Sequence, residues 1–413
     1  MVEVARVARD RQAEGDAWAQ LAFAHFTALS WDHVPHVKRC AEEAGLIARE
    51  VGDQQLLARA LHHLGGVDLM HGDLPEAEGK FMEALRIGEA GGFKAVTVQV
   101  RGQIAAQAYW RGDFPAVVEI CRTAEEEARD IHDGFSELFS VAFRCLAHIG
   151  QGEHTEGLGV ISEGLAKARD RDNKFIIGRL TNTLGWVYQE LGDFTRAIEH
   201  DREAADLGRR IKNDNVEVSS LINLGFDHLH LGEPGKALTL LEETLRRAEK
   251  GFGSHRWRWA MHVRAYLAET LITLGRPGDA LGQIGQALDV AQATGSSKYT
   301  ARCHLLRGEI ALGAGQAGEA EGDFAEALRI ARRIGYPTLT WQAAHARARA
   351  LVAAGARGQG ADRIEQAYEM ARLATDTIQS VADRLPYPAL TSVFLAWVRV
   401  REVEETLDRL RRA

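Results

Sequence analysis

Proline is scarce in this sequence, with 8 residues among 413, and β-branched residues are few beside alanine, leucine, arginine and glutamate. Proline interrupts helices, and β-branched side chains lower helix propensity. Their scarcity therefore favours helix along the whole chain. The hydrophobic fraction of 46% and the charged fraction of 26% are ordinary for a folded globular protein. Together these features predict an all-α fold.

Cysteine is rarer than proline. The four cysteines lie far apart without a CxxC pair: Cys40, Cys121, Cys145 and Cys303. This spacing argues against a disulfide framework or a cysteine-based metal site. No apolar run approaches the roughly 20 residues that cross a bilayer, and the first residues lack the long apolar stretch of a secretory signal. We expect a cytoplasmic protein with reduced cysteines and no membrane partner.

Motifs that would carry chemistry are also missing. The sequence contains no GxxxxGK[ST] and no HExxH. Residues 313–318 match GxGxxG, but a predicted helix precedes them, whereas a dinucleotide-binding fingerprint follows a strand. A net charge of −8 argues against a general nucleic-acid binder. We expect no catalytic residues, cofactor or metal, although a serine, histidine and aspartate could still meet in space.

What the sequence does have is a repeat. A glycine recurs every 40 residues and marks a turn between two helices, and after one step of 43 residues the period of 40 resumes. One helical hairpin cannot bury its apolar face alone, so such units stack on one another. The register predicts nine helix-turn-helix units with turns at Asp32, Gly72, Gly112, Gly152, Gly192, Gly232, Gly275, Gly315 and Gly355.

Two further positions keep the same register in the second helix of each unit. Small residues there would let neighbouring helices approach closely. The first position holds Val37, Ala77, Val117, Gly157, Ala197, Ala237, Ala280, Ala320 and Gly360. The second, seven residues later, holds Ala44, Ala84, Ala124, Gly164, Ala204, Thr244, Ala287, Ala327 and Ala367. Generic amphipathic helices would not hold this register.

These positions resemble the tetratricopeptide repeat. Leu184-Gly185 with Tyr188 match its first helix, and Ala77, Phe81 and Ala84 match its second. The resemblance covers roughly residues 15 to 380 and implies a right-handed α-solenoid. The usual period is 34 residues, so this 40-residue form is similar to the repeats in arms of bacterial signal-transduction regulators. Units three, four and nine depart from the pattern, with Ala105, Cys145 and Ala348 in place of the first-helix glycine.

The expected organisation has three parts. Residues 1–14 form an N-terminal capping helix or a partial repeat, 15–383 form the solenoid, and 384–413 form C-terminal capping helices in which Val393, Phe394 and Trp397 hide the last apolar face. The slip in the period lies near residues 250–259. It indicates either a longer loop with a packed tryptophan or a kink that contacts a partner.

In stacked hairpins of this kind the first helices line a concave groove. Counting from Gly185, we expect Trp186 and Phe226 in mid-groove, although both could instead pack between hairpins, and only one of Tyr109 and Trp110 to face inward. The complete two-lysine, two-asparagine clamp that related proteins use for a C-terminal carboxylate is missing. The predicted partner-binding residues are Arg59, His62, Tyr109, Arg179, Asn182, Trp186, Gln189, Phe226, His262, Glu269, Arg302 and Glu309.

The leading hypothesis is a scaffold that holds a protein or peptide segment in this groove without chemistry of its own. Asparagine would take backbone groups, arginine would take carboxylates, and the aromatic rings would take an apolar anchor. The alternative is a sensory arm of a bacterial signal-transduction regulator of the ATPase or cyclase type, binding a small effector. Neither hypothesis involves an enzyme.

Overall fold

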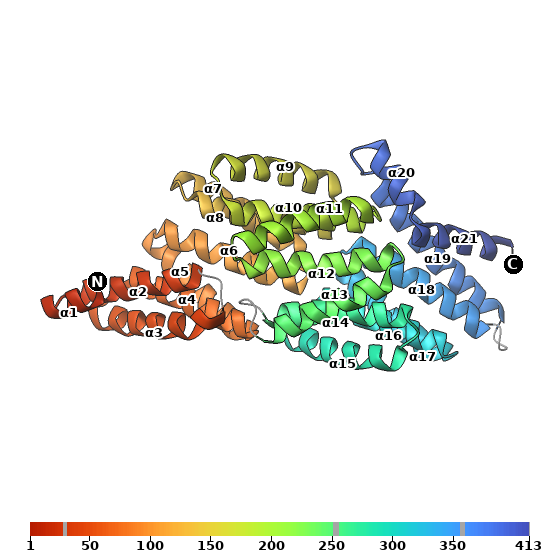
Figure 1. Ribbon diagram of the computed structural model, residues 1–413, viewed down its shortest axis with the longest axis horizontal. Coiled ribbons are helices and arrows are strands. Elements are labelled where there is room, and N and C mark those ends of the chain that lie inside the picture. The colour runs from red at the N-terminus through yellow and green to blue at the C-terminus, as the bar shows by residue number, and fades with distance from the viewer. Residues whose placement is uncertain (28–30, 251–255, 356–359, 413) are drawn as a thin grey trace.

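The computed structural model describes residues 1–27, 31–250, 256–355 and 360–412, and these residues form helices without any strand. The predicted all-α solenoid is confirmed: consecutive helices pack side by side, and the two termini lie at opposite ends of the long axis (Figure 1). The helices are α1 (Val2–Ala8), α2 (Arg11–Thr27), α3 (Val34–Val51), α4 (Gln54–His71), α5 (Leu74–Gly91), α6 (Lys94–Arg111), α7 (Phe114–Asp130), α8 (Gly134–Gly150), α9 (His154–Asp170), α10 (Lys174–Glu190), α11 (Phe194–Arg210), α12 (Asp214–His230), α13 (Pro234–Glu249), α14 (Arg256–Thr273), α15 (Pro277–Ala293), α16 (Ser297–Gly313), α17 (Ala317–Arg333), α18 (Pro337–Gly355), α19 (Gly360–Ala382), α20 (Pro388–Ala396) and α21 (Val398–Arg412), with a 3-10 helix, η1, at Trp31–His33.

The turns end one helix through a residue with positive φ, and at several turns an aspartate or asparagine side chain also caps the next helix. At the turn between α10 and α11, Gly192 adopts a φ of 72°, and the amide of Asp193 donates to the carbonyl of Tyr188 at 2.9 Å. The Asp193 carboxylate then accepts from the amide of Arg196 at 3.2 Å and caps α11. The left-handed residue recurs every 20 residues, because the turns between units use it too; there it is Gly52, Gly92, His132, Asp172, Lys212, Gly295 and Gly335.

The small residues of the repeat lie where helices meet. Ala77, Ala197 and Ala320 are fully buried, as the register predicts. The first-helix glycine has a similar role, because a Cβ atom on Gly65 would lie 2.7 Å from the ring of Phe81. Bulky residues of the second helix therefore fill the space that a missing side chain leaves in the first.

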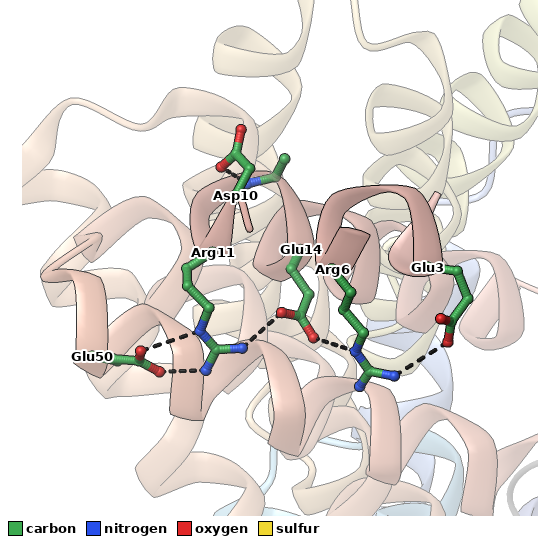
Figure 2. Close-up of polar contacts among 7 residues, drawn as sticks. Glu3, Arg6, Asp10, Arg11, Glu14 and Glu50 are labelled. Carbon is green, nitrogen blue, oxygen red and sulfur yellow. Dashed lines mark hydrogen bonds and ion pairs between the residues drawn. The ribbon is translucent and has the colours of Figure 1, made fainter. Parts of the chain in front are cut away.

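A ladder of alternating charges fixes the N-terminal helix. The guanidinium of Arg6 joins Glu3 at 3.3 Å and Glu14 at 2.7 Å, and Arg11 joins Glu14 at 2.7 Å and Glu50 (Figure 2). Asp10 caps α2 by accepting from the amide of Ala13 at 2.9 Å. These contacts tie α1 and α2 to the end of α3.

The superhelix closes on itself, which the repeat alone does not predict. Helix α4 packs against α14, and α6 packs against α16. The indole of Trp257 donates to the carbonyl of Leu69 at 3.0 Å, and the hydroxyl of Tyr336 donates to Glu190 at 2.5 Å. Helices of later repeat units therefore pack against helices of earlier units.

The tryptophans beside the slip in the period are packed inside the protein. Trp259 is 1% exposed, and Trp257 lies edge-on to Trp110 with ring centroids 5.5 Å apart. Residues 251–255 of the slip lie outside the described residues, as do residues 356–359 after the predicted turn at Gly355. The packed-tryptophan alternative holds for Trp257 and Trp259.

Two helices follow residue 384, and their contacts reach further than the sequence predicts. Leu407 of α21 packs on Ala348 and Ala371, so α21 covers the last helix pair. The ring of Trp397 lies edge-on to Trp341 of α18 at 5.6 Å, and it also reaches back to Phe194 of α11, at 5.7 Å. The closed superhelix brings that distant ring within its reach.

Candidate functional site

A cavity of about 520 Å³ opens on the inner face of the N-terminal half. Residues of α2, α4, α6, α8 and α10 line it, and small residues make room for its rings: a Cβ atom on Gly102 would lie 3.2 Å from Phe139. A volume in this range is typical of ligand sites. Six phenylalanines contribute to its wall: Phe23, Phe26, Phe135, Phe139, Phe143 and Phe175.

Three of these phenylalanines come from one helix at a spacing of four residues. Phe135, Phe139 and Phe143 therefore share one face of α8. Their rings contact in sequence, with centroids 6.1 Å and then 5.1 Å apart, and Phe175 of α10 stacks on Phe135 at 6.3 Å. The result is a continuous aromatic wall, with Phe135 still 48% exposed at its outer end.

Two arginines lie at the inner end of this cavity. Arg179 of α10 is 9% exposed, and its guanidinium carbon lies 5.9 Å from the centroid of Phe143. Arg258 of α14 lies 5.3 Å from the centroid of Trp110, and its guanidinium donates to Asn215 at 3.2 Å. Burial lowers the pKa of both groups, and the Arg179 charge lowers the pKa of Arg258 further, to about 9.

A second, smaller cavity of about 100 Å³ continues inward and shares Trp110, Arg179 and Arg258 with the first. Lys298 of α16 lines it, with its ammonium 4.3 Å from the centroid of Trp186. Burial lowers the pKa of Lys298 to about 8. Three cationic side chains thus surround this space, and its described lining includes no carboxylate.

Glu190 binds Trp186, which lines the smaller cavity. Its carboxylate accepts from the indole of Trp186 at 2.9 Å, from the hydroxyl of Tyr336 at 2.5 Å and from Thr338. These bonds join α10 to α18, whose residues lie almost 150 positions later in the chain. Glu190 is therefore engaged by three hydroxyl or indole donors.

A third cavity, of about 260 Å³, lies near the C-terminus. Glu269 at its edge pairs with Arg302 at 2.5 Å and Arg399 at 2.7 Å. These cations hold the pKa of the Glu269 carboxyl well below its usual range against the opposing effect of burial. Glu309 pairs with Arg349 at 2.9 Å, so both of these carboxylates are compensated.

A buried polar network lies behind the smaller cavity, between α10, α11 and α12. The carboxylate of Asp201 accepts from Asn182 at 2.6 Å and from Asn223 at 3.2 Å, and Asp227 accepts from Gln189 at 2.7 Å. Both acids are fully buried, and burial raises the pKa of each well above its usual range. The charge of Asp227 raises the pKa of Asp201 further.

The structure distributes the predicted groove residues among these places. It brings Tyr109, Arg179, Asn182, Trp186 and His262 together around the smaller cavity, and it places His62 in the large cavity. Glu269 and Glu309 line the third cavity. The other four residues line none of these three cavities. Arg59 pairs with Asp16, Gln189 belongs to the polar network, Arg302 pairs with Glu269, and Phe226 packs on Tyr266 at 4.4 Å.

Burial changes the ionisation of several predicted residues. The pKa of His62 falls to about 4 because its ring is desolvated, and the pKa of His262 falls well below its usual range for the same reason. Burial raises the pKa of Tyr109. At neutral pH both histidines are therefore uncharged and the tyrosine keeps its proton.

One expectation about orientation is wrong. Tyr109 and Trp110 do not compete for one inward position, because both line the smaller cavity. The superhelix brings the start of α14 against the end of α6. The end of α6 therefore faces the interior on two sides.

Sequence reasoning missed Arg258 and Lys298, which approach the site from later units. Counting along one helix face cannot reveal a residue that arrives through superhelical closure. The four-residue spacing of Phe135, Phe139 and Phe143 was a usable signal within the sequence.

Other classes of site find no support in the described ranges. They contain no group of three or more histidine, cysteine, aspartate or glutamate side chains placed to hold a metal ion, and all four cysteines are free and buried. None of the helices in these ranges is long and apolar enough to span a membrane. The GxGxxG match follows α16 and contains the turn residue Gly315, as its helical context predicts.

Comparison with known proteins identifies the repeat and the fold. A family model described as tetratricopeptide repeat matches residues 176–250. A Rap protein complexed with competence and sporulation factor has a similar structure, with a TM-score of 0.58 and 13% identity over 98% of this chain and 99% of that chain. The Rap conjugation gene regulator of plasmid pLS20, in complex with the Phr* peptide, gives a TM-score of 0.54 and 13% identity over 90% and 98%. No curated protein matches the sequence.

Proposed function

Because the chain is a tetratricopeptide-repeat protein, we propose that it binds a peptide or protein segment in the cavity lined by α2, α4, α6, α8 and α10. The observation that carries this proposal is the aromatic wall of Phe135, Phe139 and Phe143 beside a cavity of about 520 Å³. Apolar side chains of a peptide would replace water against these rings, at roughly 25 cal/mol per Å² of apolar surface buried.

Polar groups in the same cavity suit a peptide backbone. Gln99 and Gln103 of α6 lie one helical turn apart and line the cavity. Their amide groups have no hydrogen-bond partner within the described chain, so each can donate to a carbonyl and accept from an amide. The two structurally similar Rap proteins are described in complex with a factor or a peptide, which agrees with this proposal.

We further propose that the protein works without catalysis, in the cytoplasm, as a binding module. Residues 1–14 and 384–413 would close the two ends of a solenoid formed by 15–383. The contact of α21 with Ala348 and Ala371 supports a cap at the C-terminal end, and at the other end α2 (Arg11–Thr27), which crosses residue 14, joins the first residues to α3.

Binding of a small effector is the second candidate. It is favoured by the volume of the cavity, which falls within the range of small-molecule sites. In that case the protein would act as a sensory arm of a regulator.

The test uses the full chain and a pool of random acetylated pentapeptides, with binding measured by equilibrium dialysis and mass spectrometry. Phe135→Ala should weaken binding at least about fivefold, because the side chain forms the outer end of the aromatic wall. Met82→Ala is the matched control: Met82 is similarly exposed, at 51%, but lies on α5 outside the cavity. Equal loss in both variants, or no enrichment of any peptide, would contradict the proposal.

A further inference from the structure

Arg179 and Arg258 are cations without counter-ions. Within the described chain neither forms an ion pair, although most other arginines of the inner helices do. Arg179 is nine-tenths buried, makes no side-chain hydrogen bond within the described residues and lines both cavities. A buried charge is costly unless it is paired, so a fold that keeps two of them together points to an external anion.

The two guanidinium groups face a common space. Arg179 rests on Phe143, Arg258 rests on Trp110, and the rings of Phe143 and Trp110 contact edge to face with centroids 6.4 Å apart. Aromatic faces leave the edges of a guanidinium group free to donate. The charge of Arg179 also acts on Arg258, whose pKa it lowers beyond the effect of burial.

No carboxylate of the described residues pairs with Arg179 or Arg258, whereas the charge of Glu190 acts on Lys298 and opposes the fall in the pKa of Lys298. Asp133 is the acidic residue among the described lining of the large cavity, and its two oxygens accept from the amide and hydroxyl of Ser136 at 3.0 and 2.6 Å. Lys298 adds a third positive charge on the inner side. An anion entering from the large cavity would therefore meet two unpaired guanidinium groups where the two cavities join.

We propose that Arg179 and Arg258 bind the free C-terminal carboxylate of a peptide whose last apolar side chains lie against the phenylalanines of the large cavity. This inference rests on the proposed function and specifies its ligand. A carboxylate matches the planar donor edge of a guanidinium group, and the carboxylate of a chain terminus can accept from both guanidinium groups at once. Gln99 and Gln103 would then hold the backbone of the preceding residues.

This pair of arginines differs from the two-lysine, two-asparagine clamp that related proteins use for a C-terminal carboxylate. Its two cations come from α10 and α14, which the closed superhelix brings together. Arg179 and Arg258 line both cavities, so a carboxylate at the junction of the two cavities can reach both guanidinium groups from the large cavity.

The experiment compares two peptide pools on the full chain. Both contain random acetylated pentapeptides with an aliphatic or aromatic residue at each of the last two positions, one as free acids and the other as C-terminal amides. Binding is measured by equilibrium dialysis with mass spectrometry. We expect the best free acids to bind at least about tenfold more tightly than the corresponding amides. For Arg179→Gln and Arg258→Gln we expect this preference to fall to about twofold or less.

Arg264→Gln is the matched control. Arg264 also lies on α14, but its guanidinium is already engaged by Glu249 and by Gln283. This variant should keep the preference for acids. Thermal unfolding of each variant establishes that it is folded, and the binding of the amide pool to each variant reports on the cavity separately from the carboxylate.

The outcomes separate this inference from the proposed function. Equal binding of acids and amides to the unsubstituted chain would overturn the carboxylate site and leave peptide binding intact. Failure of both pools to bind would contradict peptide binding itself. A preference for acids that survives Arg179→Gln and Arg258→Gln would place the carboxylate elsewhere and overturn the assignment.

Discussion

The indole of Trp397, near the C-terminus, lies directly on Gly192, the turn residue between α10 and α11. A Cβ atom on Gly192 would come within 2.7 Å of the Trp397 ring. The same indole contacts Phe194 and Trp341, so one side chain joins three helix pairs. A glycine is therefore favoured at position 192 for two reasons: its backbone has a positive φ, and the Trp397 ring occupies the space that a side chain would need.

Gly192→Ala should consequently destabilise the protein more than Gly232→Ala. Both glycines have positive φ values, of 72° and 79°, so both substitutions carry a backbone cost of about 1–2 kcal/mol. Only Gly192 also faces a neighbouring ring, since nothing lies within 4 Å of a Cβ atom on Gly232. Chemical denaturation of the two variants should show an additional loss of about 1–3 kcal/mol for Gly192→Ala. Equal losses would mean that Trp397 moves away without cost.

The buried acids Asp201 and Asp227 should make stability fall as the pH rises. The pKa of each is raised in the folded state, so the folded protein keeps protons that the unfolded chain loses above about pH 4. Their contribution is complete below the unfolded pKa and is lost as the pH rises through the folded pKa, with a slope of at most about 1.4 kcal/mol per pH unit for each group.

Asp201→Asn tests this expectation. The substitution removes one titrating group and keeps an oxygen that can accept from Asn182 and Asn223. Between pH 4 and 7, urea unfolding should show a smaller decline in the free energy of unfolding for the variant than for the parent. If the difference in the free energy of unfolding between the variant and the parent stays constant from pH 4 to 7, Asp201 is ionised in the folded protein.

Arg179→Met should stabilise the unliganded protein. The substitution removes a buried charge that repels Arg258, and the methionine side chain can still pack on Phe143. We expect a gain of about 1–4 kcal/mol by chemical denaturation. Arg144→Met is the contrasting control, because Arg144 forms two bonds to Glu125 at 2.7 and 2.9 Å and its loss should destabilise. A loss of stability in both variants would indicate that Arg179 is compensated within the fold.

Ala197→Leu should destabilise the solenoid by about 1–3 kcal/mol, because Ala197 is fully buried at a close helix contact. Ile198→Leu, at the next and also buried position, conserves volume and should cost less than about 1.5 kcal/mol. The comparison is read from unfolding midpoints at constant denaturant slope. A neutral Ala197→Leu would show that the helices can separate at this point.

The sequence by itself determined the helix pairs and their contacts. The turn glycines, the buried alanines and the aspartate caps are local features, because each depends on residues within about 20 positions along the chain. A repeat carries this information many times over, so its register is unmistakable. The aromatic face of α8 is local too, because its phenylalanines recur every four residues within one helix.

Only the tertiary structure decided what fills the inside of the superhelix. Small rotations between successive units accumulate, and their sum brings Trp257 against Leu69, Tyr336 against Glu190 and Trp397 against Gly192. No single repeat encodes that sum. The candidate site depends on it, because Arg258 and Arg179 meet across a distance in sequence that local patterning cannot span.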